Sequence, residues 1–178
     1  MVQVILVDQY DQEIWFEEKI KAHELGLLHR AFSLFVFNQQ WQLLLQRRAL
    51  DKYHSWWLWT NTVCSHPKPD EDIVQWCKTR MIEEMWFSTD VQEIFAFVYR
   101  SDYENWLSEH EYDHVFVWYY DDDPVPNPEE VCEYSWKSLA DIRQDMTQDP
   151  ENYTTWFYKI MINDDYFQTL GDHSLLHW

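Results

Sequence analysis

One helical segment set between runs of strand-forming residues constrains the fold of this chain more than any other feature. Apolar side chains recur at helical spacing across 69–85, at Ile73, Val74, Cys77, Met81 and Met85. Proline and acidic residues occupy the first turn of this segment, where the helix dipole favours them. Runs rich in Val, Ile and Phe lie before and after it. This order predicts a mixed α/β or α+β domain, in which a helix is inserted among the strands.

The remaining elements follow from local patterns. Strands are expected at 2–7, 13–16, 30–37, 42–47, 91–99, 110–120 and 130–136. The segment 17–25 is expected to be helical or irregular and to end at Gly26. Ser138, with Asp141 three positions later, is typical of a helix start, and 153–170 has an amphipathic pattern that predicts one final helix. We expect a single compact domain over 1–170 and a loose C-terminal tail over 171–178.

The charge distribution limits the classes of partner. The chain has 178 residues and a net charge of −19, so we expect no nucleic-acid partner. Nine of the 13 basic residues nevertheless lie between Lys19 and Arg80, which indicates either an anionic ligand or chance clustering on the surface. No apolar run reaches the roughly 18 residues of a membrane helix, so we expect no membrane partner.

The three cysteines and the N-terminal residues indicate the cellular compartment in which the protein is expected. Cys64, Cys77 and Cys132 are too few and odd in number for a disulfide framework, which favours a reducing environment. The start, MVQVILVDQYDQ, has neither a basic stretch nor a long apolar run, so no signal peptide is expected. A cytoplasmic location is the resulting expectation.

Glycine is almost absent from the sequence. There are two glycines and 12 tryptophans, whereas average usage of roughly 7% would give about a dozen glycines. Tryptophan stands where a turn would favour glycine, as at Trp41 in the segment NQQWQ. This bias suggests an altered or engineered sequence.

Several side chains with catalytic or metal-binding chemistry are spaced along the chain. Cys64 and His66 are two residues apart and could form a nucleophile–base pair, a metal site or simply packed structure. Glu109 and Glu111 share one face of a predicted strand. With three histidines, these carboxylates would suit Mn²⁺ or Zn²⁺, although such groups taken singly are usually structural or solvated. The histidines in question are His23, His29 and His66.

The motifs that carry these residues resemble a known family. The segments KAHELGLLHRAFSLFVFN, LLLQRRALDKYHS, LWTNTVCSHP, IEEM and SEHEYDHVF are similar to those of type I isopentenyl-diphosphate isomerases. The resemblance covers about 2–170 and implies a Nudix-like fold, with mixed β-sheets sandwiched by helices. It also implies interconversion of isopentenyl and dimethylallyl diphosphate in isoprenoid precursor biosynthesis, by a monomer or a homodimer.

The resemblance further implies roles for individual residues. Cys64 and Glu111 become the proton-transfer pair on opposite faces of the substrate, supported by Tyr99 beside the glutamate and by Trp156, whose ring would stabilise a cation. Glu84 would bind a Mg²⁺ that arrives with the diphosphate. The implied ligands of the second metal are His23, His29, His66, Glu109 and Glu111, and the implied diphosphate-binding residues are Lys19, Arg48, Lys52 and Arg80.

The chain departs from the family pattern at glycine positions. Replacements are expected at Trp56, Trp57, Asp70, Trp86, Trp106 and Trp118, and the ring of Trp57 could fill the mouth of the pocket. One alternative is therefore a catalytically impaired or engineered variant that keeps the fold and the metal site. A Nudix-type diphosphate hydrolase is a further alternative, suggested by Glu83 and Glu84. Thr79 and Arg80, which stand where a hydrolase has Arg-Glu, argue against it.

Overall fold

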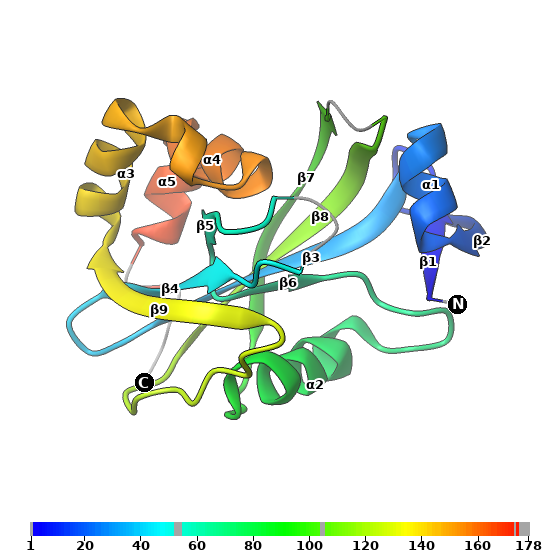
Figure 1. The fold of residues 1–178 in the computed structure, drawn as a ribbon. Helices are drawn as coiled ribbons and strands as arrows, with labels where there is room; N and C mark the ends of the chain where they lie inside the picture. The colour runs from blue at the N-terminus through cyan, green and yellow to red at the C-terminus, as the bar shows by residue number, and fades with distance from the viewer. Residues whose placement is uncertain (1, 52–54, 104–105, 173, 175–178) are drawn as a thin grey trace.

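A mixed β-sheet forms the centre of the molecule, and helices cover it on both sides (Figure 1). The computed structural model describes residues 2–51, 55–103, 106–172 and 174. The strands are β1 Gln3–Val7, β2 Glu13–Glu18, β3 His29–Phe37, β4 Gln42–Arg48, β5 Trp59–Thr60, β6 Val63–Ser65, β7 Gln92–Asp102, β8 Ser108–Tyr119 and β9 Val131–Ser138. The helices are α1 Lys19–Leu25, α2 Ile73–Met85, α3 Leu139–Gln148, α4 Thr155–Ile162 and α5 Asp164–Leu170, with a short 3-10 turn at Pro150–Asn152. The predicted α/β class is confirmed.

Strand β3 organises the sheet. Its parallel neighbour β8 runs along one edge, while β1, β6 and β4 pair in turn with the other edge, all antiparallel. Strand β7 extends the sheet beyond β8, and β9 and β5 pair with β4. His29 lies opposite Glu111, and Ser33 lies opposite Cys64. Because side chains alternate along a strand, these four residues share one face of the sheet.

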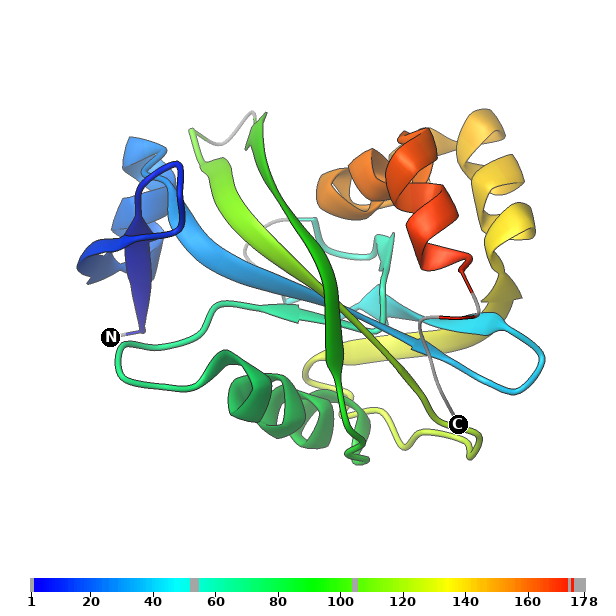
Figure 2. The same cartoon turned by 180° about the vertical axis from the view of Figure 1, so that it is seen from behind.

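Two hydrophobic clusters fix the layers. On one face, Phe35 and Phe37 pack with Phe157 of α4 and with the neighbouring helices α3 and α5. On the other face, Phe32 and Leu34 pack under α2. Figure 2 shows α2 and the group α3–α5 on opposite sides of the strands. The expected arrangement of sheets between helices is therefore present.

Helix α2 starts later than the sequence predicted. Pro69 and Asp70 lie in a turn before the helix, and its first residue is Ile73. The reason is the cap at Asp72, whose carboxylate accepts a hydrogen bond from the backbone N–H of Gln75 at 3.0 Å. The acidic residues thus precede the first turn instead of occupying it.

The single final helix predicted over 153–170 is wrong. The chain forms α4 and α5, separated at Asn163, which has an extended backbone with ψ of 120°. The Asn163 side chain accepts a hydrogen bond from the N–H of Tyr166 and so starts the second helix. The predicted cap at Ser138 is confirmed, because its hydroxyl accepts from the N–H of Asp141.

Two further parts of the chain were less well anticipated. The segment 17–25 divides between β2 and α1, and Gly26 ends α1 in the left-handed region with φ of 61°. The short strands β5 and β6 were not predicted. Of the expected tail, residues 173 and 175–178 lie outside the described residues. Among the described residues, no helix combines the length and the apolar character needed to span a bilayer.

Most positions at which a glycine replacement was expected have a backbone conformation that favours glycine. Four bulky or polar residues at expected glycine positions have positive φ: Trp57 at 65°, Asp70 at 65°, Trp86 at 58° and Trp106 at 66°. The turn residue Trp41 also has a φ of 55°. Side chains with a Cβ are strained in this region, whereas glycine is not. Trp118 lies in β8, and both it and Trp56 are outside this φ region, so neither position needs the freedom of glycine.

Candidate active site

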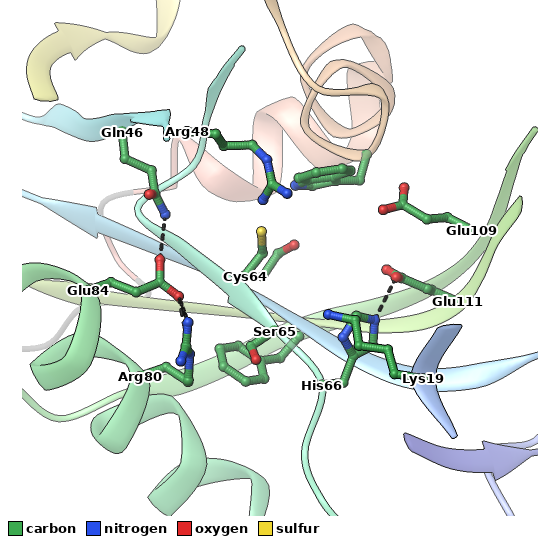
Figure 3. Close-up of a pocket in the computed structure, with 13 residues that line it drawn as sticks. Lys19, Gln46, Arg48, Cys64, Ser65, His66, Arg80, Glu84, Glu109 and Glu111 are labelled. Atoms are coloured by element: carbon green, nitrogen blue, oxygen red, sulfur yellow. Dashed lines mark hydrogen bonds and ion pairs between the residues drawn. The ribbon is translucent and has the colours of Figure 1, made fainter. Parts of the chain in front are cut away.

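One pocket collects most of the residues singled out in the sequence. It opens between the sheet, α1, α2 and α4, and it holds about 620 Å³ of empty space, open solvent included. Figure 3 shows side chains from these separate elements converging on the thiol of Cys64. The lining residues are Lys19, Phe32, Ser33, Gln46, Arg48, Cys64, Ser65, His66, Arg80, Glu84, Glu109, Glu111 and Trp156.

Four candidate metal ligands gather at one end of this pocket. His23 of α1, His29 of β3, His66 and Glu111 of β8 each offer a ligand atom, and these atoms all lie within 4.8 Å of one another. The Nδ1 atoms of His23 and His29 contact the carbonyl oxygens of Lys19 and Leu27, at 2.6 and 2.8 Å. A carbonyl can only accept, so Nδ1 carries the hydrogen and Nε2 presents its lone pair. This donor set fits a divalent transition metal.

The electrostatics of the cluster agree with this fit. Burial lowers the pKa of His23 to about 4 and that of His66 to about 3, which keeps both imidazoles neutral. A neutral imidazole is the form that binds a metal. Burial opposes the charge of Glu111, but His66 and His29 hold the pKa of this carboxyl well below its usual range. The nearest approach is between His66 Nε2 and Glu111 Oε1, at 2.8 Å.

Glu109 was grouped with these ligands in the sequence, but in the structure it lies apart from the four-residue cluster. Its Oε2 atom accepts a hydrogen bond from Tyr103 at 2.7 Å and lies 3.3 Å from the hydroxyl of Tyr99. Burial and the nearby charge of Glu111 raise the pKa of Glu109 to about 8. Tyr103 is a contact that sequence reasoning missed.

Cys64 and Glu111 have the contrasting properties of a proton donor and a proton acceptor. Burial raises the pKa of the Cys64 thiol to about 12, against the opposing effect of Arg48, so the thiol stays protonated near neutral pH. Tyr99 donates a hydrogen bond of 2.6 Å to Glu111 Oε2. A protonated thiol and an ionised carboxylate therefore face the same pocket.

Trp156 closes the pocket from the side of α4. Its indole is 3% exposed, and its Nε1 donates a hydrogen bond of 3.1 Å to Asn61 Oδ1. The guanidinium carbon of Arg48 lies 5.4 Å from the centre of the Trp156 ring, close enough for a cation–π contact. Asn61 belongs to the LWTN motif, yet its role in orienting this ring could not be read from the sequence.

Three of the four expected diphosphate-binding residues line the pocket. Lys19, Arg48 and Arg80 do so, and Lys52 lies outside the described residues. Burial lowers the pKa of Lys19 to about 8. The buried carboxyl group of Glu84 accepts hydrogen bonds from two side chains. Arg80 Nη2 donates to Oε1 at 2.7 Å, and Gln46 Nε2 donates to Oε2 at 2.8 Å. Gln46 was not among the site residues predicted from the sequence.

The two adjacent tryptophans lie elsewhere. Neither Trp56 nor Trp57 is among the residues that line the pocket. The ring of Trp57 packs instead against Arg47, whose guanidinium carbon lies 4.0 Å from the ring centre. The expectation that Trp57 fills the mouth of the pocket is therefore wrong. Its strain is local to the backbone and leaves the pocket open.

Comparisons with known sequences identify relatives of this chain. A family model described as the NUDIX domain matches residues 27–157. An isopentenyl-diphosphate Delta-isomerase of Serratia proteamaculans is 41% identical over 175 residues, covering 98% of this chain and 94% of the relative. Isopentenyl-diphosphate Delta-isomerase 2 of Aromatoleum aromaticum is 46% identical over 154 residues, covering 86% of this chain and 82% of the relative.

Solved structures share the fold at low sequence identity. The DR0079 protein of Deinococcus radiodurans superimposes with a TM-score of 0.74 at 16% identity, covering 89% of this chain and 96% of the other. A MutT protein of Methanosarcina mazei gives 0.62 at 18% identity, covering 83% and 95%. These likenesses establish the Nudix fold, and the sequence relatives identify the branch. The chain belongs to the type I isopentenyl-diphosphate Delta-isomerase family of the Nudix superfamily.

Proposed function

We propose that this protein interconverts isopentenyl diphosphate and dimethylallyl diphosphate by adding one proton and removing another. The observation that carries the proposal is the placement of Cys64 and Glu111 in one pocket, in complementary protonation states. A hydrolase would need an activated water. A double-bond shift needs only a donor and an acceptor within reach of carbon.

Cys64 and Glu111 together account for the one proton added to the substrate and the one proton removed from it. The Cys64 S–H bond breaks, and its proton bonds to the terminal alkene carbon, which leaves a tertiary carbocation and a thiolate. A C–H bond on the neighbouring methylene then breaks, its electrons form the new double bond, and its proton goes to Glu111. The Tyr99 hydroxyl, 2.6 Å from Glu111, orients the carboxylate for this transfer. The reverse reaction runs through the same groups.

Charged and aromatic side chains would hold the substrate and the cation. Lys19, Arg48 and Arg80 would bind the diphosphate, together with Lys52. The face of Trp156 would stabilise the tertiary cation, because the ring quadrupole attracts positive charge. The side chains that line the pocket would limit contact between that cation and water.

The proposed function includes two metal sites. The three histidines and Glu111 would hold Mn²⁺ or Zn²⁺, with Glu109 as a fifth ligand. Glu84 would bind a Mg²⁺ that accompanies the diphosphate. The metals would supply positive charge that orders the carboxylates and balances the diphosphate. The base Glu111 is itself one of the four clustered residues, so the integrity of the cluster would control where that carboxylate points.

The unit that performs this reaction would be 1–170, as a monomer or homodimer. The described cysteines, Cys64, Cys77 and Cys132, are all free thiols, which suits a reducing compartment such as the cytoplasm.

Turnover combined with metal analysis tests the proposal. The protein would be incubated with isopentenyl diphosphate and Mg²⁺, and product would be followed by NMR while divalent metal is quantified on the same sample. Formation of dimethylallyl diphosphate supports the assignment. Phosphate release without isomerisation would favour a hydrolase, and bound metal with neither reaction would favour an impaired variant.

A further inference from the structure

We infer that Tyr103 is a positioning residue that orients Glu109 for metal binding and ties it to the helix that carries Trp156. The inference rests on the proposed function only for the identity of the reaction. Its geometry stands on the hydrogen bonds of Tyr103 itself. Tyr103 follows the last residue of β7, where the chain leaves the sheet beside the pocket.

The Tyr103 hydroxyl joins two elements that are far apart in the sequence. It donates a hydrogen bond of 2.7 Å to Glu109 Oε2 in β8, and it lies 2.8 Å from Thr155 Oγ1 at the start of α4. A phenol has one hydrogen, and Glu109 takes it, so Thr155 must be the donor in the second bond. The result is a directed chain from Thr155 through Tyr103 to Glu109.

These hydrogen bonds hold Glu109, the proposed ligand of the histidine site that lies apart from the four-residue cluster. Tyr103 fixes the Oε2 atom of Glu109 and thereby sets the direction in which its other oxygen points. Groups that hydrogen-bond to a metal ligand typically contribute about 10–100-fold to metal affinity. Tyr99 also contacts Oε2, but at 3.3 Å and with a shorter bond to Glu111. Of these two tyrosines, Tyr103 therefore makes the closer contact with Glu109.

The hydroxyl of Tyr103 is also connected to the side of the pocket formed by Trp156. Thr155 directly precedes Trp156, which Asn61 holds from the opposite side through the indole Nε1. Tyr103 also hydrogen-bonds with Ser55, whose carbonyl accepts from Arg48 Nε at 3.1 Å. The Tyr103 side chain thus links Glu109, the start of α4 and Ser55, which in turn contacts the side chain of Arg48. Loss of its hydroxyl would loosen the geometry of the site and leave the apolar core in place.

Metal affinity provides a test that does not depend on turnover. Mn²⁺ dissociation constants would be measured by calorimetry for the wild-type protein, Tyr103→Phe, Glu109→Gln and the double variant. Tyr10→Phe is the matched control, because it removes the same group from a side chain that is 71% exposed. Thr155→Val and Thr155→Ser test the second bond, since only serine keeps the donor hydroxyl. Thermal unfolding of each variant reports on stability.

The inference predicts that Tyr103→Phe raises the Mn²⁺ dissociation constant about tenfold and that it adds little in the Glu109→Gln background. Thr155→Val should weaken Mn²⁺ binding by a smaller factor, and Thr155→Ser should keep the wild-type affinity. With isopentenyl diphosphate, Tyr103→Phe should lower kcat several-fold while KM stays within about twofold, because the proposed diphosphate-binding residues Lys19, Arg48 and Arg80 are all retained.

Two results would overturn the inference: unchanged Mn²⁺ affinity in Tyr103→Phe, or the same loss with and without Glu109. A lower melting temperature with normal metal affinity would likewise assign Tyr103 to structure alone. If the wild-type protein binds Mn²⁺ but does not isomerise the substrate, the proposed function fails. The affinity series would still decide the role of Tyr103.

Discussion

Cys64 and Glu111 lie on the two strands that flank β3, and both point to the same face of the sheet. Cys64 pairs with Ser33 across one edge of β3, and Glu111 pairs with His29 across the other. The thiol and the carboxylate are thus separated by the width of one strand and displaced along it. A small substrate lying over β3 would meet one group on each side, which is the arrangement that a proton shift requires.

Replacing the thiol should remove activity and leave the metal site intact. Cys64→Ala is expected to lower kcat on the order of 10³-fold or more, because it removes the proposed proton donor. Metal content should equal that of the wild-type protein, since Cys64 is not one of the clustered ligands. Steady-state kinetics and metal analysis check this. Cys132→Ala, which removes an exposed thiol, should retain full activity, and comparable activity in Cys64→Ala would rule out the proposed role.

Removing the metal should destabilise the protein. The buried imidazoles of His23 and His29 and the carboxylate of Glu111 would share the cation as ligands, so its removal takes away interactions made only in the folded protein. A ligand present at 100 times its dissociation constant contributes about 2.7 kcal/mol, so a chelator should lower the melting temperature by several degrees. Adding Mn²⁺ or Zn²⁺ should restore it. His29→Asn should abolish this response, and an identical response in that variant would contradict the assignment.

Replacing a strained tryptophan by glycine should stabilise the protein. Trp86 ends α2 with φ of 58° and is 71% exposed, so its side chain offers little packing to offset the strain. Trp86→Gly is expected to raise the free energy of unfolding by about 1 kcal/mol. Trp118→Gly is the matched control and should destabilise, because Trp118 is extended within β8. Urea denaturation of both variants checks the sign of each effect.

Stability should fall at alkaline pH in a way that depends on Tyr153. Burial and the charge of Asp145 raise the pKa of Tyr153 to about 12. In the unfolded chain tyrosine ionises near about 10, so the folded state favours the protonated phenol. Stability from this group is complete below about pH 10 and is lost as the pH rises towards 12. Tyr153→Phe should make the decline shallower, by at most about 1.4 kcal/mol per pH unit. Equal slopes in urea unfolding would refute this.

The elements with strong local signals were predictable from sequence. The periodic apolar residues of α2 and the Val- and Phe-rich run of β3 gave both type and approximate position. Boundaries failed where one side chain decides them, as at the caps Asp72 and Asn163. The strands β5 and β6 are two and three residues long, too short for a periodic pattern. Trp57 and Trp86 were predicted to stand at glycine positions, and both have the positive φ that favours glycine.

The site was predictable only in part. Cys64, His66 and Glu111 stood in distinctive motifs, and the resemblance to a family supplied their association. Gln46 and Tyr103 have no such signal, because their importance arises from hydrogen bonds to Glu84 and Glu109 across elements far apart in sequence. Local periodicity contains no information on such contacts. The Trp57 expectation failed for the same reason, since the direction of its ring depends on Arg47.

The most direct test of the central claim is isomerisation in deuterium oxide. Isopentenyl diphosphate would be incubated in D₂O with the metal-loaded wild-type protein, Cys64→Ala and Glu111→Gln, and the products followed by NMR. We predict that the wild-type protein forms dimethylallyl diphosphate with deuterium in the new methyl group, and that neither variant does. No conversion by metal-loaded wild-type protein, or unchanged deuterium incorporation in Cys64→Ala, would contradict the account.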